Sequence, residues 1–190
     1  MKTILAVTLF IFSSGANASQ YDGTLSMFEN GINVKKTYHQ ILKETNINDL
    51  SVASVTLHKS ALAVFSNPDS AENKKSFLSN FPQSFSLFTK IFNPKDFGQL
   101  YDGFIYINLF QKLSNEYPVI SVSIYLSLAG EACLTADAPN YLRNALLSFH
   151  NDHPDIYKEN YSKLSLRKQK NIRQFRLASL HEGGNGTCNF

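Results

Sequence analysis

The chain has 190 residues, of which 43% are hydrophobic, 13% aromatic and 17% charged. This composition, with fifteen Phe and nine Tyr, indicates a folded core and excludes a largely disordered chain. The formal net charge of +3 is too small to indicate the concentrated basic surface that nucleic acid requires, so we expect no nucleic-acid partner.

Residues 1–18 have the features of a cleavable secretory signal peptide. Lys2 supplies a positive charge, and nine apolar residues follow from Ile4 to Phe12. Ala16-Asn17-Ala18 matches the pattern that signal peptidase cleaves, so we expect cleavage after Ala18. Nine apolar residues are too few for a transmembrane helix, which needs about 20. The alternative is an N-terminal helix that is retained in the core.

The predicted mature chain, residues 19–190, has a length that is typical of one domain. It contains no internal repeat and no long linker. We therefore expect a single helical domain that is periplasmic or secreted, with no transmembrane segment in the mature part. A bacterial source is favoured.

The first predicted helix covers Leu25 to Leu42, where apolar residues mostly recur at spacings of three, four and seven. Asp22 is its expected N-cap. Residues 50–65 also fit a helix, although several of their side chains raise the strand propensity, namely Val52, Val55, Thr56 and Val64.

The turn Asn67-Pro68-Asp69-Ser70 predicts the cap of a further helix, which Pro82 then ends or kinks. A short helix with Phe85 and Phe88 on its apolar side is expected next. The apolar residues between Leu100 and Leu113 surround nearly the whole circumference of a helix, which indicates a central, covered position.

Pro118 is expected in the first turn of another buried helix, residues 118–132, where its missing N–H costs nothing. Because this segment is rich in β-branched residues, a strand is the main alternative there. Asp137 and Pro139 predict the start of the next helix. A helical turn is expected over residues 155–161.

The last helix is predicted over about residues 162–181, with Gly183-Gly184 after it as a C-cap pattern. The whole chain therefore predicts an all-α fold, a compact multi-helix domain of six to eight short helices with brief connections.

Two cysteines, Cys133 and Cys188, are present in the chain. Because exported proteins meet an oxidising compartment, we expect them to form one disulfide that staples the C-terminal tail. Such a bond would close a loop of about 56 residues and contribute about 4 kcal/mol on the chain-entropy model. A thiol nucleophile or a metal ligand is the alternative.

A metal site is one candidate for chemistry. His150, Asp152 and His153 offer ligands that suit zinc, with Glu159 or His181 to complete the site. However, the usual helical zinc motif places its two His four residues apart, whereas these are three apart and span a helix end and a Pro. A polar helix terminus explains the same residues, so the sequence assigns no metal.

A second candidate is Glu131, which lies in an apolar stretch and would act as a general acid if it were buried. Its partner in an acid–base pair would be one of three other carboxylates, Glu116, Asp102 or Asp137. Partial exposure at a helix end explains Glu131 equally well, and no catalytic residue is assigned.

The last predicted helix is the most basic stretch of the chain, with Arg167, Lys168, Lys170, Arg173 and Arg176. One interpretation is a docking face that binds an acidic partner or an anionic membrane surface. The other is a solvated helix face whose positive charge complements the helix dipole.

We find no nucleophile elbow, no phosphate-binding loop and no signature of a known family, and we expect no cofactor. The sequence therefore favours an exported, non-catalytic helical binding protein whose partner is another protein. A periplasmic inhibitor or immunity-type protein of a secreted toxin is a concrete version. The alternatives are an exported hydrolase, metal-dependent or acid–base, and a helical carrier of a lipid or other small ligand.

Overall fold

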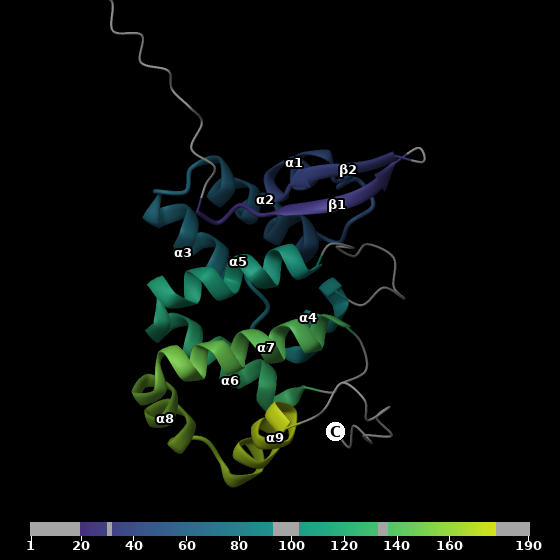
Figure 1. Cartoon of the computed structure of the whole chain (residues 1–190). Coiled ribbons are helices and arrows are strands. Elements are labelled where there is room, and N and C mark those ends of the chain that lie inside the picture. The colour runs from purple at the N-terminus through teal and green to yellow at the C-terminus, as the bar shows by residue number, and fades with distance from the viewer. Residues whose placement is uncertain (1–19, 30–31, 93–102, 133–136, 178–190) are drawn as a thin grey trace, which may run out of the picture.

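The computed structural model describes residues 20–29, 32–92, 103–132 and 137–177, and most of these lie in helices (Figure 1). An antiparallel hairpin comes first, with strands β1 (Thr24–Glu29) and β2 (Ile32–Thr37). Nine helices follow within the described ranges: α1 (Tyr38–Glu44), α2 (Val52–Ser66), α3 (Ala71–Asn80), α4 (Phe85–Phe92), α5 (Gly103–Glu116), α6 (Pro118–Glu131), α7 (Asp137–Asp152), α8 (Pro154–Ser162) and α9 (Leu166–Leu177).

The prediction of a mostly helical chain is confirmed, and the helices are slightly more numerous than the six to eight expected. None of those in the described ranges is long and apolar enough to cross a membrane. The predicted signal peptide, the Cys133–Cys188 disulfide and the Gly183-Gly184 helix end all lie outside the described residues.

The predicted helix between Leu25 and Leu42 is wrong over most of its length. Strands β1 and β2 pair in a register that runs from Thr24↔Thr37 to Glu29↔Ile32. A capping box starts α1 only after them: the Thr37 side chain accepts from the Gln40 N–H, and the Gln40 side chain accepts from the Thr37 N–H. The expected cap, Asp22, instead accepts from the backbone N–H groups of Gly23 and His39.

Other expected helices are present with small changes of boundary. Residues 118–131 form a helix despite their β-branched side chains, with Pro118 in its first turn. The last helix begins at Leu166 instead of about residue 162. Ser165 sets this start because its hydroxyl accepts from the Lys168 N–H at 3.4 Å, and the preceding turn separates α9 from α8.

Aromatic side chains connect the helices through the middle of the molecule. Phe81 stacks on Phe110 of α5 with ring centroids 4.1 Å apart, and Phe110 meets Tyr125 of α6 at 4.7 Å. Tyr125 in turn lies 5.1 Å from Phe149 of α7. We call these four residues the aromatic column. All four are buried, so the column joins the end of α3 to three later helices.

The helices are arranged in successive levels along the molecule (Figure 1). The hairpin and α1 to α3 lie at one end, α5 crosses the middle, and α8 and α9 lie at the opposite end. Helix α5 packs on α7, and α6 packs on both α8 and α9. The last two helices therefore pack on α6 and α7 and leave their remaining faces to solvent.

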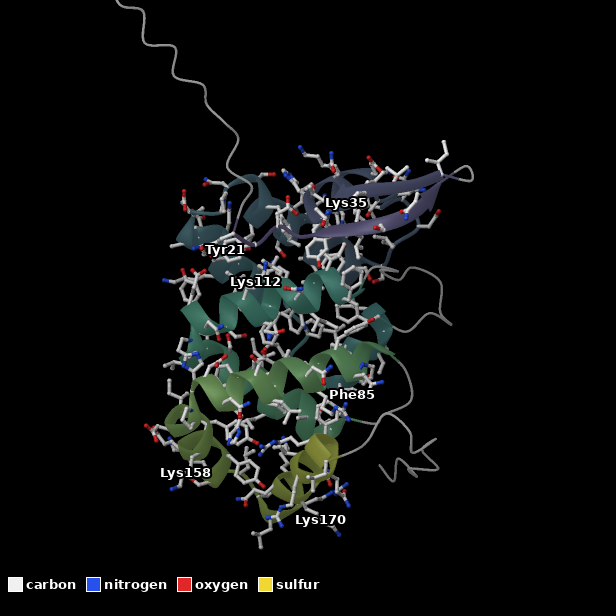
Figure 2. All side chains as sticks on the ribbon, viewed as in Figure 1. Tyr21, Lys35, Phe85, Lys112, Lys158 and Lys170 are labelled. Carbon is white, nitrogen blue, oxygen red and sulfur yellow. The ribbon has the colours of Figure 1, made fainter. Side chains whose placement is uncertain are left out.

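The first described residues are fastened to the helical body. The Tyr21 hydroxyl donates to Glu116 Oε1, and Lys74 Nζ lies 2.7 Å from Glu116 Oε2. Lys112 Nζ donates to the carbonyl oxygens of Gln20 at 3.0 Å and Tyr21 at 3.3 Å, and Figure 2 shows Lys112 beside Tyr21. We call Tyr21, Lys74 and Glu116 the N-terminal latch. Burial raises the pKa of Tyr21, whereas the hydrogen bond from Lys74 to Glu116 raises the pKa of that lysine.

We expect Tyr21→Phe to lower the free energy of unfolding by about 1–2 kcal/mol, because its hydroxyl donates to a charged carboxylate that is partly exposed. Urea unfolding would measure this change. Tyr38→Phe is the matched control, since the Tyr38 hydroxyl has no hydrogen bond to any described residue, and it should cost less than about 0.5 kcal/mol. Equal costs for the two variants would contradict a role for the latch in stability.

Candidate functional site

Helix α9 concentrates positive charge on one element of the fold. Its twelve residues include five cations and no acidic residue. None of the five forms an ion pair with an acidic side chain in the described part of the chain. The exposed cations of α9 are Arg167, Lys170 and Arg173.

The opposite face of α9 is packed against α6. Ile172 and Phe175 are buried in the core, and the Asn171 side-chain amide donates to the Gly130 carbonyl oxygen at 3.0 Å. The Lys168 side chain passes over Gly130, where an added Cβ would lie 3.6 Å from the lysine Cγ. This close packing fixes the orientation of α9, and the three exposed cations consequently face solvent.

Two exposed leucines flank these cations. Leu166, at the start of α9, is 83% exposed, and Leu177, at its end, is 76% exposed. We call Arg167, Lys170 and Arg173 with these two leucines the basic α9 surface. Lys158 of α8 lies at the same end of the molecule as Lys170 (Figure 2). The arrangement combines unpaired cations with apolar side chains, which is a combination found at protein interfaces.

Beside this surface, three polar side chains from three helices meet. The Arg176 guanidinium of α9 lies 3.2 Å from His150 Nδ1 of α7, measured from its Nη2. The same guanidinium is centred 5.4 Å from the ring of Tyr157 of α8, and the His150 ring meets that tyrosine edge-on at 4.4 Å. We call these three residues the α7–α9 cluster. Burial lowers the pKa of His150, and the charge of Arg176 lowers it further.

Two buried atoms of the α7–α9 cluster have no hydrogen-bond partner. They are Arg176 Nε and the hydroxyl oxygen of Tyr157. Tyr157 is only 3% exposed, and the Arg176 guanidinium lies over its ring. Burial raises the pKa of Tyr157, while the Arg176 charge opposes that rise. The polar groups of the cluster are therefore enclosed by the three helices.

The sequence-derived metal candidates do not converge. His150 faces Arg176, Asp152 accepts from the Ser148 hydroxyl at 3.2 Å, and the His153 ring packs on Phe149 at 5.0 Å. Glu159 pairs with Lys163 at 2.6 Å, while His181 lies outside the described residues. No group of three or more His, Cys, Asp or Glu side chains in the described ranges is arranged to hold a metal ion.

Glu131 has a structural partner in the neighbouring helix. Its Oε2 accepts from the backbone N–H of Phe85, the first residue of α4, at 3.1 Å. A carboxylate at this position satisfies an otherwise free N–H group and complements the helix dipole.

The other carboxylates that were candidate partners of Glu131 do not form a pair with it. Glu116 precedes α6 and Glu131 ends it, and the 14 residues of that helix span about 21 Å. A glycosidase pair needs a separation of about 5–9.5 Å. Asp102 and the side chain of Asp137 lie outside the described part of the chain.

A buried polar pair that the sequence did not indicate lies between α2 and α5. His58 Nδ1 is 2.9 Å from the Tyr106 hydroxyl, and both side chains are almost fully buried. Burial lowers the pKa of His58. The two residues are 48 positions apart, and only the packing of α2 near α5 brings them together. Neither has a local motif that would have singled it out.

We expect Glu131→Ala to lower the free energy of unfolding by about 1 kcal/mol, because the Phe85 N–H at the start of α4 loses its acceptor, while Ser84 still accepts from Leu87. Glu131→Gln keeps an accepting oxygen and should lose about half as much. Chemical denaturation would measure both variants. An unchanged stability for Glu131→Ala would contradict the capping role.

The lowered pKa of His58 predicts that acid destabilises the fold. As the pH falls through the unfolded pKa of about 6.5, the unfolded state takes up a proton that the folded state still refuses, so the free energy of unfolding decreases. The free energy of unfolding stops decreasing when the pH is below the pKa of His58 in the folded state, because both states are then protonated. His58→Asn keeps an acceptor for Tyr106 but cannot titrate, and we expect its stability to depend less steeply on pH between about 7 and 5. Equal slopes for the two proteins would rule out this contribution.

Comparison with known proteins identifies no relative of this chain. No family model, no curated protein and no solved structure matches the chain, so the case for its function rests on its own residues.

Proposed function

We propose that this chain is an exported, non-catalytic binding protein, and that the basic α9 surface docks an acidic region of another protein. The observation that carries the proposal is the set of cations on α9, none of which is paired with an acid in the described ranges. Such a surface attracts an acidic partner and sets its orientation.

Two features favour a protein partner over an anionic membrane. The large apolar side chains in the middle of α9, Ile172 and Phe175, are buried in the core and are not free to enter a lipid layer. The exposed apolar residues, Leu166 and Leu177, stand at opposite ends of the helix. A protein interface accommodates separate apolar contacts among cations more readily than a bilayer does.

The roles of the polar residues also support binding without catalysis. Glu131 caps α4, Glu116 belongs to the N-terminal latch, and His150 contacts Arg176. Each of these three side chains therefore contacts a group with a structural role, and none of them is paired with a second residue that could complete an acid–base or metal site among the described residues. The stacked rings of the aromatic column favour a filled core over a ligand-carrying interior.

A periplasmic inhibitor or immunity-type protein of a secreted toxin is the concrete form that we propose. The size of the chain, its predicted export and its unpaired basic surface suit a partner with an acidic recognition site. The proposal of an inhibitor or immunity-type protein rests on the general class of small exported proteins and on the charge of α9, because small helical folds carry many unrelated functions.

The test compares two triple variants that remove the same charge. Arg167→Gln, Lys170→Gln and Arg173→Gln alter the basic α9 surface, whereas Lys59→Gln, Lys75→Gln and Lys90→Gln alter exposed lysines of α2, α3 and α4. Tagged proteins exported by the native cell would be recovered from its envelope and medium. We expect an acidic protein to copurify in near-equal amounts with the wild type and the control variant, and at least about tenfold less with the α9 variant.

Binding would then be repeated with the purified partner at increasing salt, where we expect the affinity to fall because exposed charges are screened. A partner that the α9 variant retains would contradict the proposal. Failure to recover any stoichiometric protein at low or moderate salt would also contradict it. Vesicles that contain phosphatidylglycerol serve as a further probe, and binding to them that depends on the α9 cations would favour a membrane surface instead.

A further inference from the structure

Four exposed side chains form a single line along α9. Because a helix has 3.6 residues per turn, side chains at positions i, i+4, i+7 and i+11 fall within about 60° of one another around its axis. The residues of α9 at these positions are Leu166, Lys170, Arg173 and Leu177. All four are exposed, and Figure 2 places Lys170 at the outer end of the molecule. We call this line the outer stripe of α9.

The outer stripe faces away from the helix on which α9 packs. Ile172 and Phe175 are buried, and the Asn171 side chain donates to the Gly130 carbonyl oxygen of α6. Helical geometry centres these three residues of α9 about 180° from the middle of the stripe. The packing of α9 on α6 therefore leaves the whole outer stripe accessible to a partner.

The outer stripe has a fixed chemical order, with two cations between two leucines. Neither Lys170 nor Arg173 forms an ion pair with an acidic side chain in the described ranges. A partner that covers the stripe removes these cations from water, so it has to supply carboxylates to compensate them. The same partner gains affinity when it buries the two leucines. The surface that fits is therefore apolar, acidic, acidic and apolar in turn.

The spacing of the outer stripe matches an α-helix better than a β-strand. Eleven residues of helix rise about 16.5 Å, and a second helix presents side chains at i, i+4, i+7 and i+11 over the same length. Four side chains on one face of a strand span about 20 Å, because they recur every two residues. A strand aligned with Leu166 would therefore miss Leu177 by about 3 Å.

We propose that the outer stripe of α9 binds one amphipathic α-helix of the partner protein, which carries apolar, acidic, acidic and apolar side chains at positions i, i+4, i+7 and i+11. This inference rests on the proposed function and deepens it, because it names the element of the partner that the basic α9 surface recognises. The axes of the two helices would lie about 8–10 Å apart. The order of the stripe is the same in both directions, so it sets the register of the partner helix and leaves its direction open.

The test uses a designed peptide as the probe. This stripe peptide is alanine-based, has blocked ends, and carries Leu, Glu, Glu and Leu at positions i, i+4, i+7 and i+11. In the control peptide both Glu are moved by two positions, which places them on the opposite face at the same net charge. Fluorescence anisotropy would measure the affinity of each labelled peptide for the purified protein. We expect the stripe peptide to bind at least about tenfold more tightly than the control peptide.

Equal affinities of the two peptides would overturn the proposal, because the protein would then recognise charge without regard to its position on the helix. Failure of both peptides to bind would overturn it as well. An unstructured hexaglutamate peptide that binds as tightly as the stripe peptide would show that the partner element is not a helix.

Two arginines of α9 provide a matched pair of variants. Arg173 belongs to the outer stripe, whereas Arg167 lies about 90° to one side of it, and both are exposed. We expect Arg173→Gln to weaken binding of the stripe peptide about tenfold. Arg167→Gln removes the same charge and should weaken binding by less than about twofold. Equal effects of the two variants would overturn the proposed register.

A second pair of variants tests the apolar ends of the outer stripe. Leu166→Gln is compared with Val52→Gln, because each replaces an exposed apolar residue at the first position of a helix. We expect Leu166→Gln to weaken binding of the stripe peptide about fivefold and Val52→Gln to leave it unchanged. Since neither residue is buried, both variants should melt close to the wild-type temperature. Unchanged peptide binding by Leu166→Gln would overturn the proposal.

Three further results separate this inference from the proposed function. If the α9 triple variant loses the natural partner while Leu166→Gln and Leu177→Gln retain it fully, the docking surface stands and the helical register is wrong. If sedimentation of the protein alone shows a dimer that Leu177→Gln dissociates, the occupant is a second copy of this chain. If Leu166→Gln abolishes binding to phosphatidylglycerol vesicles, the occupant is a membrane. The last two results would overturn the proposed function together with this inference.

Discussion

The stacking of Phe81 on Phe110 is the contact on which the arrangement of the helices most depends. It brings the end of α3 against α5, and the next two rings of the aromatic column extend the packing through α6 to α7. Each ring buries a large apolar area, and stacked or tilted rings add a geometric preference to that burial. Helices α5, α6 and α7 and the end of α3 are thereby held around one line of rings.

Because aromatic rings fill the core, the polar side chains of the candidate site lie at its edges. Helix α9 attaches to α6 through Ile172 and Phe175, and its cations consequently lie on the side away from the core. The α7–α9 cluster forms where α7, α8 and α9 meet outside the column. The positions of the basic α9 surface and of the α7–α9 cluster thus follow from the way in which α8 and α9 pack on the rest of the fold.

The sequence predicted most of the helices because their signals are local. Ser70 caps α3 through the Asn73 N–H, and Pro118 stands in the first turn of α6, as spacing alone suggested. The hairpin was missed because Leu25 to Leu42 contains a helix-like spacing, although Asn30-Gly31 is a dipeptide that favours hairpin turns. The basic character of α9 was evident, whereas the contacts of Arg176 with His150 and Tyr157 were not. These contacts depend on the packing of three helices, which no local pattern encodes.

The N-terminal latch has a consequence for the order in which the chain acquires its structure. Tyr21 and Glu116 are 95 positions apart, so the latch cannot close until α5 has been synthesised. A contact over such a separation forms late because the closure of a long loop carries an entropic cost. The first-made part of the described chain is therefore among the last to be secured to the helical body.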